Sequence, residues 1–333
     1  MPDESYPVPP IELLELATGY QRSKTLFALV AFEVPTLLAH RSLPLSDIAT
    51  AIKLHPIAAD RFLNACVALN LLERVGGEFR NTALSERFLV KGKPTYLGDQ
   101  CSHYDKDSYP LWTTLASNLR SWHPGSAVHD IPNSAVEGNE SMKAQHNLSL
   151  MVGHALGQAF DFSRHQLLLD LGGGTAAMSI GICQVNPLIR SIVFDLPGIT
   201  EIAQTFVDSA NLGSRISVLP GNFKEDVLPD GFDIALLANL LSVASEETNR
   251  RLFRSIYDLL PPGGVCIISG WILDDSRTSP LIPVLFCLED IGWQAPDVER
   301  TESTYKRWLE EAGFTTVERS LYCPPTSMLV AWK

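Results

Sequence analysis

The sequence has few features that would direct it to a membrane or to a nucleic acid. It is short of positive charge, with 26 lysines and arginines against 38 acidic residues and a formal net charge of −12. This balance disfavours nucleic acid and anionic membrane surfaces as partners. The longest apolar runs, such as residues 26–32, are too short to span a bilayer. Residues 1–5 include no basic segment followed by an apolar core, so we expect no signal peptide and a cytoplasmic protein.

The six cysteines are isolated from one another, which argues against a metal site or a disulfide framework. They form no C-x-x-C pair and have no histidine at a spacing typical of zinc ligands. We therefore expect reduced, mostly buried thiols and no bound metal. The length of 333 residues predicts two domains, each with its own core.

The most informative stretch runs from Leu167 to Ala177, with the sequence LLLDLGGGTAA. A short apolar run that ends in Asp170 and is followed by Gly172, Gly173 and Gly174 indicates a buried strand turning sharply into a helix. Such a turn lets a nucleotide approach the backbone closely. The dinucleotide pattern G-x-G-x-x-G/A is also met by Gly172, Gly174 and Ala177, so the loop alone leaves a nicotinamide or flavin cofactor open.

Three more predicted strands end in residues suited to adenosine. Residues 191–195 end in Asp195, followed by Leu196, where a carboxylate can accept hydrogen bonds from ribose hydroxyls. Residues 216–220 lead to Gly221, Asn222 and Phe223, which suit the edge and face of adenine. A fourth strand, 232–238, leads to Asn239, which we expect at the same edge. Strands and helices alternating at this spacing predict an α/β doubly wound parallel sheet.

Several motifs in this order resemble the S-adenosylmethionine-dependent small-molecule O-methyltransferases of plant caffeate-type and bacterial natural-product pathways. The motifs are DLGGGT (170–175), FDLPG (194–198), GNF (221–223), LLPPGG (259–264), ERT (299–301) and EAGF (311–314). The resemblance covers nearly the whole chain. It implies a Rossmann-like methyltransferase fold, an enzyme that transfers methyl groups, and S-adenosylmethionine as cofactor with S-adenosylhomocysteine as product. An antiparallel hairpin expected near residues 315–332 fits this topology better than a dinucleotide dehydrogenase.

The first part of the chain predicts a helical domain with a winged helix. Residues 10–40 carry apolar residues at helical spacing around more than one face, so this region needs a partner to cover it. The resemblance implies an intertwined homodimer here; burial within one chain is the alternative. Residues 43–90 predict helix, helix and a β-wing with Gly76 and Gly77 at its tip. DNA binding is disfavoured because the second helix carries a single arginine, Arg61.

Residues 97–165 are expected to link the domains and to cover the substrate. Aromatic and histidine side chains are frequent there, and an apolar cavity with a few polar contacts suits a flat organic molecule. The candidate pocket residues are His103, Tyr109, Trp112, His146, Met151 and His154, with Cys287 from a helix expected over 280–293. The predicted boundaries are 1–95 for the dimerisation domain, 96–163 for the linker and lid, and 164–333 for the cofactor domain.

The base of the resembled family is missing from this chain. The family has a histidine after the fourth strand, where Ser242 stands here, and an acid after the fifth strand, where this chain has Gly270. A serine hydroxyl is too weakly basic to act alone. Glu299 matches the carboxylate of the family's Glu-Arg-Thr motif. The candidate catalytic residues are therefore Glu299, His154 and Ser242. Two smaller departures, Ala176 for a glycine and Asn222 for an aspartate, are compatible with cofactor binding.

Three hypotheses about the reaction follow. The first is a methyltransferase acting on a small aromatic or polyketide-like intermediate without the usual base. Its acceptor is then already ionised or is a nitrogen or carbon nucleophile, or else His103, His123, His146 or His154 serves as the base. The second is an enzyme that uses the bound sulfonium as an electrostatic element in cyclisation, elimination or pericyclic chemistry and moves no methyl group. The third is a non-catalytic partner subunit.

Overall fold

A computed structural model describes residues 10–123, 137–293, 295 and 300–333. The chain divides into two compact units, residues 1–107 and 108–333. The finer division into 1–95, 96–163 and 164–333 stays a prediction. No helix in the described ranges is both long and apolar enough to cross a membrane.

The first unit is helical, with a small three-stranded sheet whose strand order is β1-β3-β2. Its elements are α1 (Ile11–Ala17), α2 (Gly19–Ala31), α3 (Val34–Leu37), β1 (Leu43–Pro44), α4 (Leu45–Ala51), α5 (Pro56–Ala68), β2 (Leu72–Val75), β3 (Glu78–Asn81), α6 (Ala83–Phe88) and α7 (Gly98–His103). Leu29, Leu63 and Phe79 are fully buried and join α2, α5 and the wing in one core. Gly76 and Gly77 have positive φ at the tip of the wing. The predicted winged helix is confirmed.

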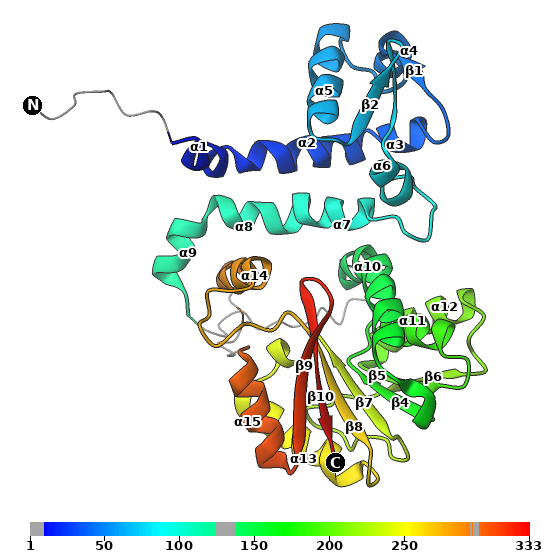
Figure 1. Cartoon of the computed structure of the whole chain (residues 1–333), viewed down its shortest axis with the longest axis vertical. Coiled ribbons are helices and arrows are strands. Elements are labelled where there is room, and N and C mark those ends of the chain that lie inside the picture. Colours follow the sequence, from blue (N-terminus) through cyan, green and yellow to red (C-terminus); the bar gives the residue numbers. More distant parts are fainter. Residues whose placement is uncertain (1–9, 124–136, 294, 296–299) are drawn as a thin grey trace, which may run out of the picture. The chain divides into compact units, whose positions relative to one another are not determined.

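The second unit is built on a seven-stranded sheet with the order β6-β5-β4-β7-β8-β10-β9 (Figure 1). The strands are β4 (Leu167–Leu171), β5 (Arg190–Asp195), β6 (Ile216–Pro220), β7 (Ile234–Ala238), β8 (Val265–Gly270), β9 (Thr316–Cys323) and β10 (Thr326–Trp332). Strands β4 to β8 are parallel, and β10 runs antiparallel to both β8 and β9. The predicted parallel sheet with a closing hairpin is confirmed.

Helices cover both faces of this sheet. They are α10 (Glu137–Ala159), α11 (Ala177–Val185), α12 (Pro197–Ser209), α13 (Glu246–Leu259) and α15 (Glu302–Ala312). Helices α8 (Tyr109–Thr113) and α9 (Leu115–Ser121) pack against α14 (Leu281–Gly292). The short turns are η1 (Tyr104–Ser108), at the boundary of the two units, η2 (Phe162–Arg164) and η3 (Leu241–Val243). Ser245 caps α13 by accepting the N–H of Thr248 at 3.3 Å.

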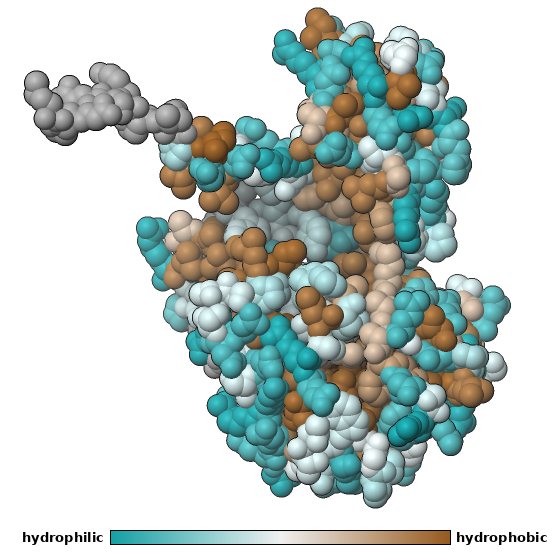
Figure 2. All heavy atoms as spheres, viewed as in Figure 1, coloured by the Kyte–Doolittle hydropathy of each residue, from teal (hydrophilic) through white to brown (hydrophobic). Residues whose placement is uncertain are grey.

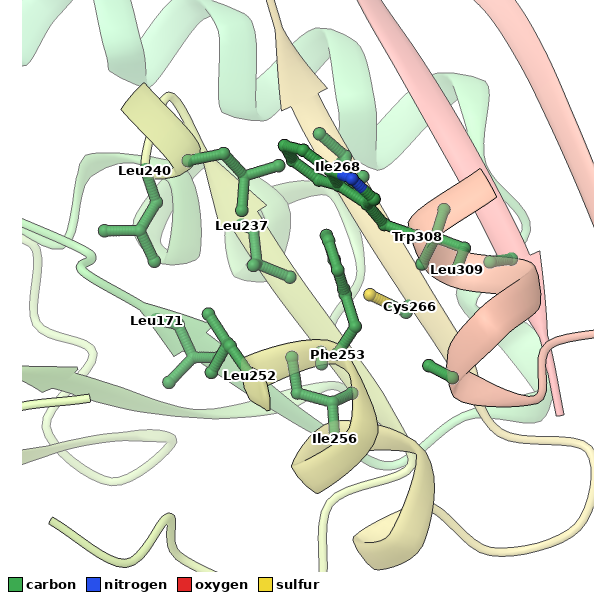
Figure 3. Packing of buried hydrophobic residues seen from close by; sticks show 14 of the residues in the cluster. Leu171, Leu237, Leu240, Leu252, Phe253, Ile256, Cys266, Ile268, Trp308 and Leu309 are labelled. Atoms are coloured by element: carbon green, nitrogen blue, oxygen red, sulfur yellow. The ribbon is translucent and has the colours of Figure 1, made fainter. Parts of the chain in front are cut away.

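Two apolar cores fix the sheet between its helices. Helices α10, α11 and α12 share one core with the sheet, and α13 and α15 share the other. In the second core the rings of Phe253 and Trp308 lie 6.5 Å apart, against Cys266 and Ile268 of β8 (Figure 3). Because both faces are buried, β7 and β8 are apolar except at Ser269, as is typical of central parallel strands. This packing brings the carboxyl ends of five parallel strands to one edge.

Candidate functional site

The turn after β4 begins the site at this edge. Gly172 and Gly174 have φ of +65° and +56°, which favours glycine. A Cβ on Gly172 would lie 2.4 Å from Leu240 Cδ1, and one on Gly173 would lie 2.9 Å from the Asp170 carboxyl group. Side chains at Gly172 and Gly173 would therefore collide with their neighbours, and at Gly174 the left-handed backbone favours glycine. Ala176 also has a positive φ, +61°, at a cost of about 1 kcal/mol for a residue with a Cβ.

Asp195 holds this turn from the neighbouring strand. Its Oδ2 accepts the N–H of Gly174 at 2.8 Å, and its Oδ1 accepts the N–H of Leu196 at 2.7 Å. Burial raises the pKa of this carboxyl group, while the two backbone donors lower it. A carboxylate has about four lone-pair positions, so two donors leave room for others.

Asp170 lies beneath the turn and is fully buried. The hydroxyl of Ser179, on α11, donates to its Oδ2 at 2.6 Å, but its Oδ1 has no hydrogen-bond partner. Burial raises the pKa of Asp170 to about 6, an effect that the Ser179 hydroxyl reduces. A buried carboxyl oxygen without a donor is unusual in a folded protein. It fits a site whose ligand brings donors or positive charge.

The segment after β6 adjoins Asp195. The N–H of Gly221 donates to the Asp195 carbonyl at 2.8 Å, and a Cβ on Gly221 would lie 2.2 Å from the ring of Phe194. Asn222 accepts the N–H of Lys224 on its side-chain oxygen at 3.0 Å. Phe223 is half-buried beside it. The predicted adenosine-facing residues of β5 and β6 thus lie together at one edge, as parallel pairing of these strands requires.

The ends of β7 and β8 carry neutral groups. Asn239 has φ of +52°, and its N–H donates to the Ser269 carbonyl at 2.9 Å. Ser242 lies in η3 and is half-buried. Gly270 ends β8, and a Cβ there would lie 3.0 Å from Asn239 Oδ1. None of these three side chains can accept a proton at neutral pH.

The candidate histidines are spread over different places. His146, on α10, is buried; its Nδ1 lies 2.8 Å from the Thr175 hydroxyl, and its ring stacks on Phe206 at 3.8 Å between centroids. Burial lowers the pKa of His146 to about 4, so the ring is neutral at neutral pH. His154, also on α10, bonds instead to the side chain of Gln184, next to last in α11. Of the two, only His146 meets the turn.

Two more candidate histidines have partners of their own. His123 has its Nδ1 2.6 Å from the Ser121 carbonyl. His103 lies in the first unit, where its Nδ1 is 2.7 Å from Asp107 Oδ2. In both residues this contact engages Nδ1.

The remaining predicted pocket residues belong to α8, α10 and α14. Trp112 donates its indole N–H to Glu289 Oε2 at 2.9 Å, which joins α8 to α14. Tyr109 and Met151 are half-buried, on α8 and α10. Cys287, on α14, lies with its Sγ 3.9 Å from an Arg300 nitrogen, and burial raises the pKa of its thiol. Glu299 lies outside the described residues.

Sequence reasoning missed an aromatic pair at the end of β8. Trp271 follows Gly270 directly, and its ring meets Phe286 of α14 edge-on, with centroids 4.7 Å apart. The position of Trp271 at a strand end was a usable signal, whereas its contact with Phe286 depends on the tertiary fold. Reasoning from spacing also missed Thr175 and Phe206, the two partners of His146.

Comparison with known proteins places the chain in a family. An O-methyltransferase domain model matches residues 124–315, and an O-methyltransferase dimerisation domain model matches residues 14–91. A 3-hydroxy-5-methyl-1-naphthoate 3-O-methyltransferase from Streptomyces sahachiroi is 30% identical over 95% of this chain and 92% of the relative. A tetracenomycin polyketide synthesis 8-O-methyl transferase from Streptomyces glaucescens is 29% identical over 97% of both chains.

A solved structure agrees. Human N-acetylserotonin methyltransferase in complex with S-adenosylmethionine superposes with a TM-score of 0.86, at 27% identity, over 100% of this chain and 99% of that one. The expected enzyme class and cofactor are confirmed. The chain belongs to the S-adenosylmethionine-dependent O-methyltransferase family.

Proposed function

We propose that this enzyme methylates a hydroxyl group of a small aromatic, polyketide-like acceptor without the aid of an enzymic histidine base. The observation that carries the proposal is the neutral end of β7 and β8, where Asn239, Ser242 and Gly270 stand. Two relatives, named for a hydroxynaphthoate and for tetracenomycin synthesis, support an aromatic acceptor. The half-buried aromatic side chains Trp112, Trp271 and Phe286 are suited to the same shape.

The cofactor residues that we propose follow the strand edge. Asp195 and Leu196 hold the ribose end, and Gly221, Asn222 and Phe223 frame the adenine, with Asn239 at the far side of the edge. Asp170 and the glycine turn lie where the amino-acid end would be bound. The support is geometric: Asp170 Oδ1 lacks a donor, Asp195 has lone pairs beyond its two backbone donors, and the turn follows a path that a Cβ at Gly172 or Gly173 would block.

The chemistry then depends on positioning. When bound, the cofactor supplies a methyl group already activated by the adjacent sulfonium. The acceptor oxygen must form its bond to that carbon as the carbon–sulfur bond breaks, and the acceptor proton must leave to water or to the protein. Since Ser242 cannot take the proton, an acceptor that ionises near neutral pH is favoured. Alignment of the reacting atoms is what the enzyme contributes.

Among the candidate bases, His154 and His146 do not suit proton abstraction. His154 is held by Gln184 beside the last turn of α11, away from the glycine turn. His146 faces Thr175, and its lowered pKa makes it a weak base. Glu299 stays a prediction.

The direct test uses hydroxynaphthoates and substituted phenols that differ in the pKa of the hydroxyl. Mass analysis should find product heavier by one methyl group and an equal amount of S-adenosylhomocysteine. The pH at which kcat/KM breaks should follow the acceptor's own pKa across the series. A break at one constant pH would instead reveal an enzymic base. Conversion of acceptor with S-adenosylmethionine left intact would favour cyclisation or elimination chemistry, and absence of cofactor binding would favour a non-catalytic subunit.

We also propose a homodimer formed through the N-terminal helices. In α1, the side chains of Ile11, Leu13, Leu14 and Leu16 are 50–78% exposed, and they form apolar surface in Figure 2. Exposed apolar residues in such number indicate an interface. The match of residues 14–91 to a dimerisation domain model supports the same conclusion. Light scattering should give the mass of a dimer, and Leu13→Glu with Leu16→Glu should give a monomer, whereas Val227→Glu, exposed in the other unit, should not.

A further inference from the structure

Helix α10 approaches the backbone of α11 closely at glycines on both helices. A Cβ on Gly153 would lie 2.7 Å from the Met178 carbonyl oxygen, and a Cβ on Gly181 would lie 2.7 Å from the His154 backbone nitrogen. Contacts this close between backbones leave little freedom for sliding. Since α11 begins directly after the glycine turn, α10 is a rigid support for that turn.

The earlier part of α10 reaches the turn itself. His146 Nδ1 lies 2.8 Å from the Thr175 hydroxyl, and Thr175 follows Gly174, whose N–H donates to Asp195. On its other side the imidazole stacks on Phe206 of α12, with ring planes 19° apart. One turn earlier on α10, the Met142 methyl lies 3.4 Å from where a Gly174 Cβ would be. The buried ring therefore connects α10, the turn and α12.

The turn needs such support. Gly172, Gly174 and Ala176 adopt left-handed conformations, which are unfavourable for Ala176 because it has a Cβ. Contacts from neighbouring elements are therefore needed to keep the turn in this conformation. A neutral imidazole has one donor and one acceptor nitrogen, so it can hold the Thr175 hydroxyl in a fixed orientation. Burial also lowers the pKa of His146, so the ring is a weak base for the proton of an acceptor.

We propose that His146 is a positioning residue, which fixes the glycine turn through Thr175 and so sets the affinity for S-adenosylmethionine and S-adenosylhomocysteine. The role rests on the cofactor site proposed above. It concerns binding of the cofactor and not proton transfer, and it gives this buried histidine a role different from that of the family's missing base.

The test compares His146→Ala and Thr175→Val with His154→Ala, a histidine on the same helix that does not meet the turn. Calorimetry should show Kd for both cofactor forms raised about tenfold by either of the first two changes, which corresponds to about 1.4 kcal/mol. The double variant should be no weaker than each single variant, because both remove one contact. His154→Ala should bind as wild type does.

Conservative changes separate positioning from a general loss of packing. His146→Asn, whose amide can lie where Nδ1 lies, and Thr175→Ser should return Kd to within about threefold of wild type. With saturating cofactor, kcat and its pH profile should stay within about threefold in all variants. If His146→Ala does not fold, as judged by circular dichroism, His146→Asn and Thr175→Val carry the test.

Two results would overturn the inference. One is an unchanged Kd in folded His146→Ala and Thr175→Val. The other is a kcat lowered by about 100-fold at saturating cofactor with Kd unchanged, which indicates a catalytic base. Wild-type protein that binds neither cofactor form would instead refute the proposed function, so the two failures are distinct.

Discussion

The two halves of the strand edge differ in the ionisable side chains that they carry. At the ends of β4 and β5, here called the cofactor half, the buried Asp170, the half-buried Asp195 and the buried His146 each make a hydrogen bond of 2.6–2.8 Å, the last two of them to the glycine turn. At the ends of β7 and β8, here called the acceptor half, the corresponding side chains are the amide of Asn239, the hydroxyl of Ser242 and the hydrogen atom of Gly270. The difference supports the proposal that the first half holds the cofactor and that methylation at the second half proceeds without a histidine base.

The largest expected effect is loss of cofactor binding in Asp195→Ala. The change removes the acceptor of the Gly174 N–H and the group proposed to hold the ribose, so Kd for S-adenosylmethionine should rise about 100-fold or more. Calorimetry measures it. Asp208→Ala, an exposed acid on α12 bonded to Gln204, is the matched control. Wild-type affinity in Asp195→Ala would remove the basis for the contrast between the two halves.

The cofactor half should also carry pH-dependent stability. The pKa of Asp170 is about 6 in the fold against 3.8 ordinarily, so the folded chain keeps a proton that the unfolded chain has lost. Its contribution is therefore most favourable below about pH 4 and falls by about 3 kcal/mol as pH rises through about 6. Urea unfolding should show Asp170→Asn gaining stability over wild type across that range, even as it weakens cofactor binding. If the free energy of unfolding changed equally with pH in wild type and in Asp170→Asn, the prediction would be wrong.

A smaller effect is expected from placing a base in the acceptor half. Ser242→His puts an imidazole in η3, and without an orienting acid at Gly270 it should speed methylation of weakly acidic phenols about tenfold. Acceptors that are already ionised should gain nothing. Rates across an acceptor series, measured above and below about pH 6.5, distinguish these cases. A uniform change for all acceptors would point to altered packing instead.

The smallest effect is expected from Ser242→Ala. If the hydroxyl takes no part in proton transfer, kcat and kcat/KM should stay within about twofold of wild type. Steady-state rates with one ionised acceptor are sufficient. A loss of about 100-fold in kcat would show that the Ser242 hydroxyl takes part in catalysis.

The sequence predicted the elements of this edge well, because each depends on local chemistry. The strand that ends near Asp170 and the glycine turn after it follow from residues close together in the chain. Pairing of parallel strands then places Asp170, Asp195 and Gly221 at one edge without further information.

Contacts between elements could not be predicted from the sequence. His146 and His154 stand on one helix, and nothing in their spacing says which of them meets the turn. That is decided by the close approach of α10 to α11 at Gly153 and Gly181. The contact of Trp271 with Phe286 likewise joins residues distant in sequence. Such contacts depend on tertiary packing, which periodicity does not encode.

The backbone contact at Gly153 and Gly181 constrains how this enzyme can be engineered. Changes in α10 aimed at a new acceptor would be transmitted through that contact to the glycine turn, so acceptor range and cofactor affinity would vary together. Trp271, which follows β8, contacts α14, and α14 is joined to α8 and not to α10 by these contacts. They are the better starting points for altering which molecules are methylated.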